Sequence, residues 1–139
     1  MALDLSRLPA PKFRYALAVE AGPFVRTAGM VGLDPATGAL VPGGAAAEFE
    51  RIMANLSALM EDNGLSSADL VSATIFLTDF STFPAINAVW ERHVEASARL
   101  PARTTVGVSA LPVGAAVEAE FVFHRSAAPA EGGTASGRA

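Results

Sequence analysis

The residues best suited to chemistry in this chain lie in two strand-like segments near its end. The first is Pro101-Ala102-Arg103-Thr104-Thr105-Val106, and the second is Val117-Glu118-Ala119-Glu120-Phe121-Val122. An arginine guanidinium holds a carboxylate through charge-assisted, paired hydrogen bonds, and a glutamate can position and activate water. We expect the two segments to form neighbouring strands. Arg103 would then hold a small anionic substrate while Glu118 activates water beside it.

Alternation along these strands decides which side chains accompany the two residues. On the strand predicted over residues 102–110, one face carries Arg103, Thr105, Gly107 and Ser109. On the strand predicted over residues 115–124, one face carries Glu118, Glu120, Val122 and His124, and the other carries Val117, Ala119, Phe121 and Phe123. Taken singly, the arginine also fits a surface position at a strand start, and the glutamates fit a solvated sheet face.

Other polar residues give weaker signals. Asn87 lies beside the apolar stripe of a predicted helix, where an ordinary half-exposed residue is also expected, and Tyr15 fits a core tyrosine. His93 and His124 have no second histidine or clustered carboxylate nearby in the sequence, which argues against a metal site. The chain has no cysteine, so disulfides, thiolate metal sites and a cysteine nucleophile are excluded.

Composition limits the class of protein. The 139 residues are enough for one domain, and 51% of them are apolar, with a mean hydropathy of +0.36. This apolar content favours an extra buried surface, most simply a homo-oligomer interface. No apolar run is long enough to span a membrane, and no signal peptide is recognisable, so we expect a cytoplasmic protein. The net charge of -4, without a basic cluster, argues against nucleic acid as a partner.

The glycines of Thr27-Ala28-Gly29-Met30-Val31-Gly32 resemble a phosphate loop only faintly, because no helix follows them. The segments around them predict a sheet with helices. Turn residues and β-rich runs indicate strands over residues 15–19, 24–28, 39–41, 70–77, 102–110 and 115–124. Helical spacing of apolar residues indicates one helix over about 45–63 and another that begins at Ser81 or Thr82 and reaches Val94.

The apolar stripes of both helices identify their buried faces. In the first helix the stripe consists of Phe49, Ile52, Met53, Leu56, Leu59 and Met60, with Glu48, Arg51 and Glu61 off it. In the second helix it consists of Phe83, Ile86, Trp90 and Val94. The order β-β-β-α-β-α-β-β predicts an α+β domain over residues 1–125, a six-stranded mixed sheet with both helices on one face. A partner subunit would cover the other face, and the Ala/Gly/Ser-rich tail over 126–139 should be disordered.

These residues together resemble the Rid family, the reactive intermediate deaminases, also called RidA/YjgF-like. The resemblance runs from about Tyr15 to Phe123, and its most specific part is Pro101 to Val106 with Leu111-Pro112 and Val117 to Glu120. Supporting matches are Thr27-Ala28-Gly29, Phe76-Leu77-Thr78-Asp79 and Ile86-Asn87-Ala88-Val89-Trp90. The resemblance implies a chorismate-mutase-like fold, a homotrimer, and sites in the clefts between subunits.

The resemblance also implies a hydrolase. Its reaction is deamination of enamine or imine intermediates such as 2-aminoacrylate to a keto acid and ammonia, without a metal or organic cofactor. Arg103 matches the arginine that holds the substrate carboxylate, and Glu118 matches the glutamate associated with the hydrolytic water. Tyr15, Gly29 and Asn87 match residues of the substrate pocket.

Some positions depart from the family pattern. Thr105 stands where many members have cysteine, and its backbone N–H can still bind substrate. Ala28 and Met30 stand where serine and glutamine are usual, which suggests a relative outside the best-known deaminase subgroup.

Three alternatives stay open. One is a non-catalytic trimer on the same scaffold that binds a small carboxylate or regulates, and a turnover assay separates it from the enzyme. Another is a ribonuclease-labelled relative, which the acidic balance disfavours. The last, a chorismate-mutase-like enzyme, rests on fold analogy alone.

Overall fold

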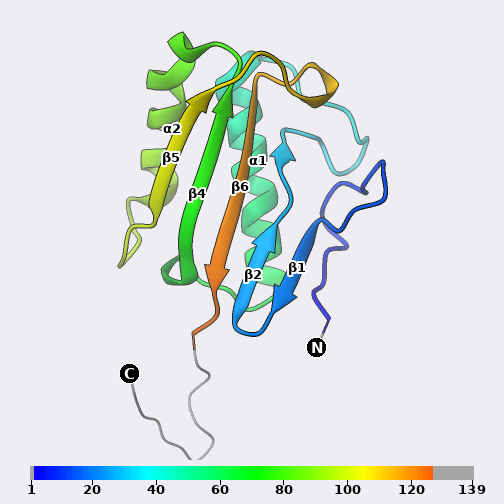
Figure 1. Ribbon diagram of the computed structural model, residues 1–139, viewed down its shortest axis with the longest axis vertical. Coiled ribbons are helices and arrows are strands. Elements are labelled where there is room, and N and C mark those ends of the chain that lie inside the picture. The colour runs from blue at the N-terminus through cyan, green and yellow to red at the C-terminus, as the bar shows by residue number, and fades with distance from the viewer. Residues whose placement is uncertain (1, 127–139) are drawn as a thin grey trace, which may run out of the picture.

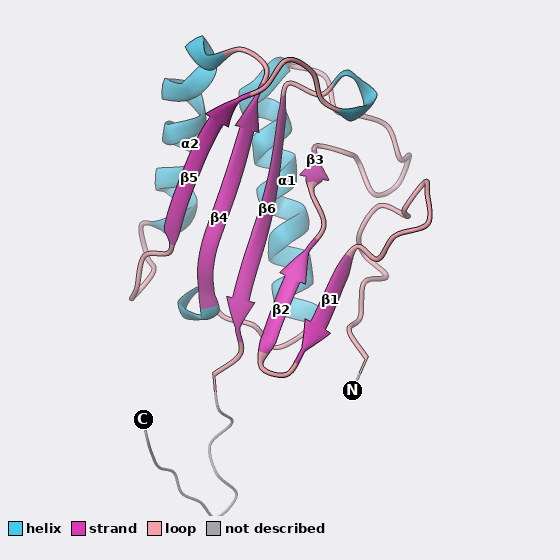
Figure 2. Ribbon diagram, viewed as in Figure 1, coloured by secondary structure: helices cyan, strands magenta, loops and turns pink. Residues whose placement is uncertain are grey.

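The structure is a computed structural model that describes residues 2–126, and it is a mixed sheet with two helices on one face (Figures 1 and 2). The strands are β1 (Ala18–Ala21), β2 (Phe24–Thr27), β3 (Met30–Val31), β4 (Leu70–Leu77), β5 (Ala102–Gly107) and β6 (Val117–His124). The helices are α1 (Gly44–Asp62) and α2 (Phe83–Val94). The predicted α+β class, with a six-stranded sheet and both helices on one face, is confirmed.

The strand order is β1-β2-β6-β4-β5, and β3 also pairs with β6. Only β4 and β5 run parallel, because α2 forms the crossover between them, and the other pairs are antiparallel. The edge strand β5 therefore has a neighbour, β4, on one side alone.

The expected strand over residues 39–41 is wrong. The third strand is β3, which extends the pairing of β2 with β6 past a break at Ala28 and Gly29. Leu40 forms only an isolated bridge with Leu33. The first strand also starts later than expected, at Ala18. Helix α2 starts at Phe83, after a short 3-10 turn in which the Asp79 side chain accepts a hydrogen bond from the Ser81 N–H.

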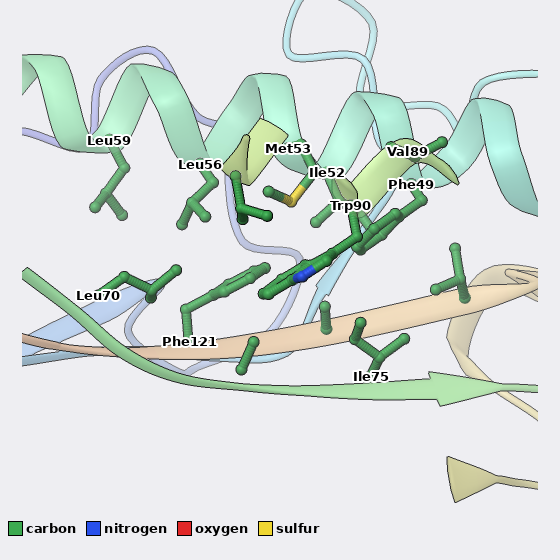
Figure 3. Packing of buried hydrophobic residues seen from close by; sticks show 14 of the residues in the cluster. Phe49, Ile52, Met53, Leu56, Leu59, Leu70, Ile75, Val89, Trp90 and Phe121 are labelled. Carbon is green, nitrogen blue, oxygen red and sulfur yellow. The ribbon is translucent and has the colours of Figure 1, made fainter. Parts of the chain in front are cut away.

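The core lies between the helices and one face of the sheet (Figure 3). From the sheet it contains Ile75, Leu77, Val117, Ala119, Phe121 and Phe123, and from the helices Phe49, Ile52, Leu56, Leu59, Ile86 and Trp90. The alternation predicted for β6 is confirmed, since each core-facing residue from Val117 to Phe123 is buried. Met60 and Phe83 are only partly buried.

Glu48 corrects the predicted face of the first helix. It was expected off the apolar stripe, but it is buried, and its Oε1 accepts a hydrogen bond from the Ala116 backbone N–H at 2.8 Å. The first turns of α1 cross the chain that follows β3, so closely that a Cβ on Gly32 would lie 2.6 Å from the Glu48 carbonyl oxygen. Gly32 thus permits close packing of backbone on backbone, and no phosphate is needed to explain it.

The opposite face of the sheet is left uncovered by the helices. It carries Thr74, Phe76, Glu118 and Glu120, which are paired across β4 and β6, and it continues to the exposed Val106 of β5. An apolar valine on an open sheet face is consistent with the expected partner subunit, which stays a prediction.

The chain still makes contacts at the predicted domain boundary, residue 125, and at the residue after it. The Ser126 hydroxyl donates to Asp69 Oδ1 at 2.6 Å, and Arg125 bonds to the Asn63 carbonyl and to Glu20. The rest of the predicted tail, residues 127–139, lies outside the described residues. Within residues 2–126, no helix has the length and apolar character needed to cross a membrane.

Candidate functional site

A cavity of about 390 Å³ lies beside the start of β6, where Glu118 lines it. Its walls come from the chain before β1, the segment from Ala28 to Leu33, and the turn at Pro112 and Val113. Three of the predicted site residues, Tyr15, Gly29 and Glu118, line it together. The β3–β6 register places Val31 opposite Glu118, which fixes the carboxylate next to Gly29.

Gly29 is close to the Glu118 side chain for a physical reason. A Cβ at position 29 would lie 2.8 Å from Glu118 Cδ, closer than real Cβ atoms approach any heavy atom. The glycine therefore leaves room for the carboxylate over the break between β2 and β3. Any other residue would displace the Glu118 carboxylate from this place.

The environment of Glu118 makes it a stronger base. Burial raises the pKa of the Glu118 carboxyl, and repulsion from the neighbouring Glu120 carboxylate raises it further. A carboxylate with a raised pKa accepts a proton from water more readily than an ordinary surface glutamate.

Arg103 lies in a second group of predicted residues, between β5 and α2. Its Nη2 donates to Asn87 Oδ1 at 2.8 Å, and its guanidinium carbon lies 5.5 Å and 5.3 Å from the ring centroids of Phe83 and Trp90. These cation–π contacts and the hydrogen bond fix the direction of the guanidinium. Within residues 2–126 no carboxylate pairs with Arg103, so further N–H donors remain for an anionic ligand.

Thr105 adds a backbone donor to this second group. The Val108 N–H donates to the Leu77 carbonyl of β4, so alternation directs the Thr105 N–H away from β4, toward the open edge of the sheet. The Thr105 hydroxyl is buried and has no hydrogen-bond partner among the described residues.

The two groups do not meet within one chain, and the expectation that Arg103 and Glu118 sit on neighbouring strands is wrong. Strand β4 lies between β5 and β6 (Figure 1). Arg103 is opposite Ala73, on the face that the helices cover, whereas Glu118 is opposite Phe76, on the uncovered face. We call the set Tyr15, Gly29 and Glu118 the base half-site, and the set Asn87, Arg103 and Thr105 the cation half-site.

Sequence reasoning missed most of the cavity lining, and two of the missed residues, Asn55 and Val113, have particular local structure. Asn55 of α1 is 1% exposed; its Nδ2 donates to the Leu33 carbonyl at 3.0 Å, and its Oδ1 has no partner among the described residues. The available signal was a polar residue inside an apolar stripe. Val113 has a φ of 53°, the one positive value at a non-glycine position among the described residues, and no sequence pattern announces it.

Metal ligands do not cluster in the described part of the chain. No group of three or more histidine, aspartate or glutamate side chains there is placed to hold an ion. The two half-sites present a guanidinium, a carboxylate and backbone N–H groups.

Comparison with known proteins gives a consistent family. The model of the family described as Endoribonuclease L-PSP matches residues 6–124. The chain is 41% identical over 117 residues to the protein DfrA of Myxococcus xanthus, covering 81% of this chain and 88% of that one. It is 33% identical over 120 residues to the 2-iminobutanoate/2-iminopropanoate deaminase of Capra hircus, covering 86% of each chain.

Solved structures agree in fold. The crystal structure of E. coli TdcF with bound serine superposes with a TM-score of 0.83 at 30% identity, covering 91% of this chain and 99% of that one. RidA from the Antarctic bacterium Psychrobacter sp. gives a TM-score of 0.81 at 35% identity, covering 89% and 98%.

Proposed function

Because the chain belongs to the Rid (YjgF-like) family, we propose that it hydrolyses reactive enamine and imine intermediates, such as 2-aminoacrylate, to a keto acid and ammonia. The observation that carries this proposal is the division of the site. One chain holds a carboxylate-binding cation and a water-activating base, and each lies in an incomplete half-site open to the surface.

The proposal requires an assembly that joins the halves. The cation half-site lies at the edge strand β5, and the base half-site lies on the uncovered face of the sheet. An interface between unlike surfaces, edge against face, brings Arg103 of one protomer to Glu118 of the next. Such head-to-tail interfaces close into rings, and we propose a homotrimer with its sites in the clefts between protomers.

In the assembled cleft, the substrate carboxylate accepts paired hydrogen bonds from Arg103 and one from the Thr105 backbone N–H. Asn87 orients the guanidinium through the bond already in place. Arg103 is suited to this role because its planar fork matches a carboxylate. These contacts leave the imine carbon facing the base half-site of the neighbouring protomer.

Glu118 then acts on water. Its carboxylate accepts one proton from water as the water oxygen bonds to the imine carbon, and the C=N electron pair moves to nitrogen. Glu118 returns this proton to the nitrogen, which gives a carbinolamine. Glu118 then accepts the proton of the carbinolamine hydroxyl as the C=O bond forms and the C–N bond breaks, and it passes that proton to the departing nitrogen, so that ammonia and the keto acid are released. An imine carbon is already electrophilic, so a positioned water and a base account for the reaction; general base catalysis contributes about a hundredfold or more.

Ammonia release from imines generated in situ by an amino-acid oxidase or a dehydratase tests this function. The wild-type protein should accelerate release, and Arg103→Ala should lose nearly all of the acceleration while keeping its fold. Arg92→Ala, on the exposed side of α2 where the residue pairs with Glu50, is the matched control and should behave as wild type.

The cation half-site alone would suffice for a protein that only binds a small carboxylate. Binding of a keto acid without acceleration of any imine would favour that second function and overturn the deaminase proposal.

A further inference from the structure

The cavity beside Glu118 is much larger and more apolar than the smallest imines require. On the basis of the deaminase function above, we propose that it receives the side chain of the substrate. The preferred substrates are then imines of amino acids with branched or extended apolar side chains, rather than those with a methyl or methylene group.

The walls of the cavity carry this inference. They are made mainly by the side chains of Leu8, Phe13, Leu17, Met30, Leu33 and Val113. The volume of about 390 Å³ falls in the range of pockets that hold whole organic ligands, which is roughly 300–1,000 Å³. A methyl group would leave most of this space empty or filled with water in contact with apolar walls.

Part of the apolar lining is exposed in the single chain. Phe13 and Val113 line the cavity and are 79% and 51% exposed there, and Tyr15, which also lines it, is 50% exposed. Large apolar side chains held in water lose contact with water when an apolar group enters between them. That gain favours longer hydrocarbon side chains.

The place of Glu118 sets the direction of the substrate. The reacting carbon must lie next to the Glu118 carboxylate, which lines the cavity. The substrate carboxylate is held on the other side of that carbon, by Arg103 of the adjoining protomer. The third substituent of the carbon, the side chain, is left to point into the cavity.

Few polar side chains line the cavity. Glu118 contributes a carboxylate, and Lys12 and Tyr15 contribute an ammonium group and a phenol that are both exposed to solvent. Asn55 Oδ1 is a buried acceptor without a partner among the described residues. Most of the remaining lining is apolar, so apolar side chains gain most from burial here.

The test compares kcat/KM for imines generated from alanine, 2-aminobutyrate, leucine and methionine. Each buried methylene is worth about fourfold, so three further carbons give roughly fiftyfold at complete burial. We expect the leucine-derived imine to exceed the alanine-derived imine by about tenfold or more. Equal or falling values with side-chain size would overturn the inference and leave the deaminase function standing.

Binding of the products gives a readout that does not depend on turnover. Calorimetry should show that 4-methyl-2-oxopentanoate binds more tightly than pyruvate, by a similar factor. Turnover of no imine at all would overturn the deaminase function, while the ratio of the two affinities would still decide whether the cavity takes an apolar side chain.

A variant that fills the cavity locates the effect. Ala28 lines the cavity, and Ala28→Leu should lower the ratio of leucine-derived to alanine-derived kcat/KM by about tenfold. Ala68→Leu adds the same side chain at an exposed position away from the cavity and should leave the ratio unchanged. An unchanged ratio in folded Ala28→Leu, judged by its melting temperature, would show that the side chain does not enter here.

Discussion

Mixing two inactive variants should restore activity if each site is shared between protomers. In one chain, β4 separates Arg103 from Glu118, and the two side chains leave opposite faces of the sheet. In Arg103→Ala every site lacks the cation, and in Glu118→Gln every site lacks the base. A mixed ring contains sites that take Arg103 from one variant and Glu118 from the other, and those sites are intact.

The expected recovery of activity follows from the random assembly of the two variants into rings. A site is intact only when one particular neighbour is Glu118→Gln and the other is Arg103→Ala. With equal amounts and random assembly, about one quarter of all sites meet this condition. The recovered fraction varies as the product of the two mole fractions, so it should be highest at equal amounts and fall symmetrically on either side.

The assay unfolds the two variants together at several mixing ratios, refolds them, verifies with two affinity tags that mixed rings have formed, and measures ammonia release by the whole refolded population. Asn87→Ala provides the matched control, because Asn87 and Arg103 belong to the same half-site and are bonded to each other. Mixed rings of Asn87→Ala and Arg103→Ala contain no intact cation half-site and should show no recovery. Verified mixed rings of the first pair without recovered activity would refute the shared site.

The remaining predictions concern packing and pH. Gly32→Ala places a Cβ 2.6 Å from the backbone of α1, so the free energy of unfolding measured by chemical denaturation should fall by about 1–3 kcal/mol. Gly107→Ala is the control, because its Cβ would make ordinary contacts, and it should change the free energy of unfolding less. Equal effects of the two substitutions would contradict this reasoning. Glu120→Gln removes the charge that adds to burial in raising the pKa of Glu118, so the acid limb of kcat/KM should move to lower pH, and an unmoved limb would count against Glu118 as the base. Burial acts to raise the pKa of Asp69, but hydrogen bonds outweigh burial and the pKa is lowered. The ionised carboxylate therefore stabilises the fold above the ordinary aspartate pKa, and this stabilisation is lost as pH falls through the pKa of the folded state. Asp69→Asn should accordingly flatten the loss of folding stability measured below about pH 4.

Local patterns predicted the parts of this fold that depend on local physics. The apolar stripe of α1 and the alternation along β6 follow from helix and strand periods, and both describe the core correctly. The third strand was misplaced because Ala39-Leu40-Val41 has the residue types of a strand, while Met30–Val31 is too short to be recognised. Its pairing depends on β6, which lies far along the chain.

The candidate site shows the same limit more sharply. The types and spacing of Arg103 and Glu118 indicated a cation and a base, and the structure gives each a suitable environment. The strand order depends on the crossover through α2 and on the insertion of β4 between β5 and β6. The residues of β5 and β6 alone do not predict either feature. The orphaned acceptor of Asn55 likewise depends on the carbonyl of Leu33, which tertiary packing brings to the helix.

Separation of the two charged groups within a chain has a chemical consequence. If Arg103 lay next to Glu118 in the protomer, the guanidinium would lower the pKa of the carboxyl, and an ion pair would occupy the donors that a substrate needs. With β4 between them, Glu118 keeps a pKa raised by burial and by Glu120, and Arg103 is held by Asn87 and two aromatic rings instead of by a carboxylate. In the proposed cleft the substrate carboxylate is the anion that occupies Arg103, so the carboxylate of Glu118 remains free to accept a proton from water.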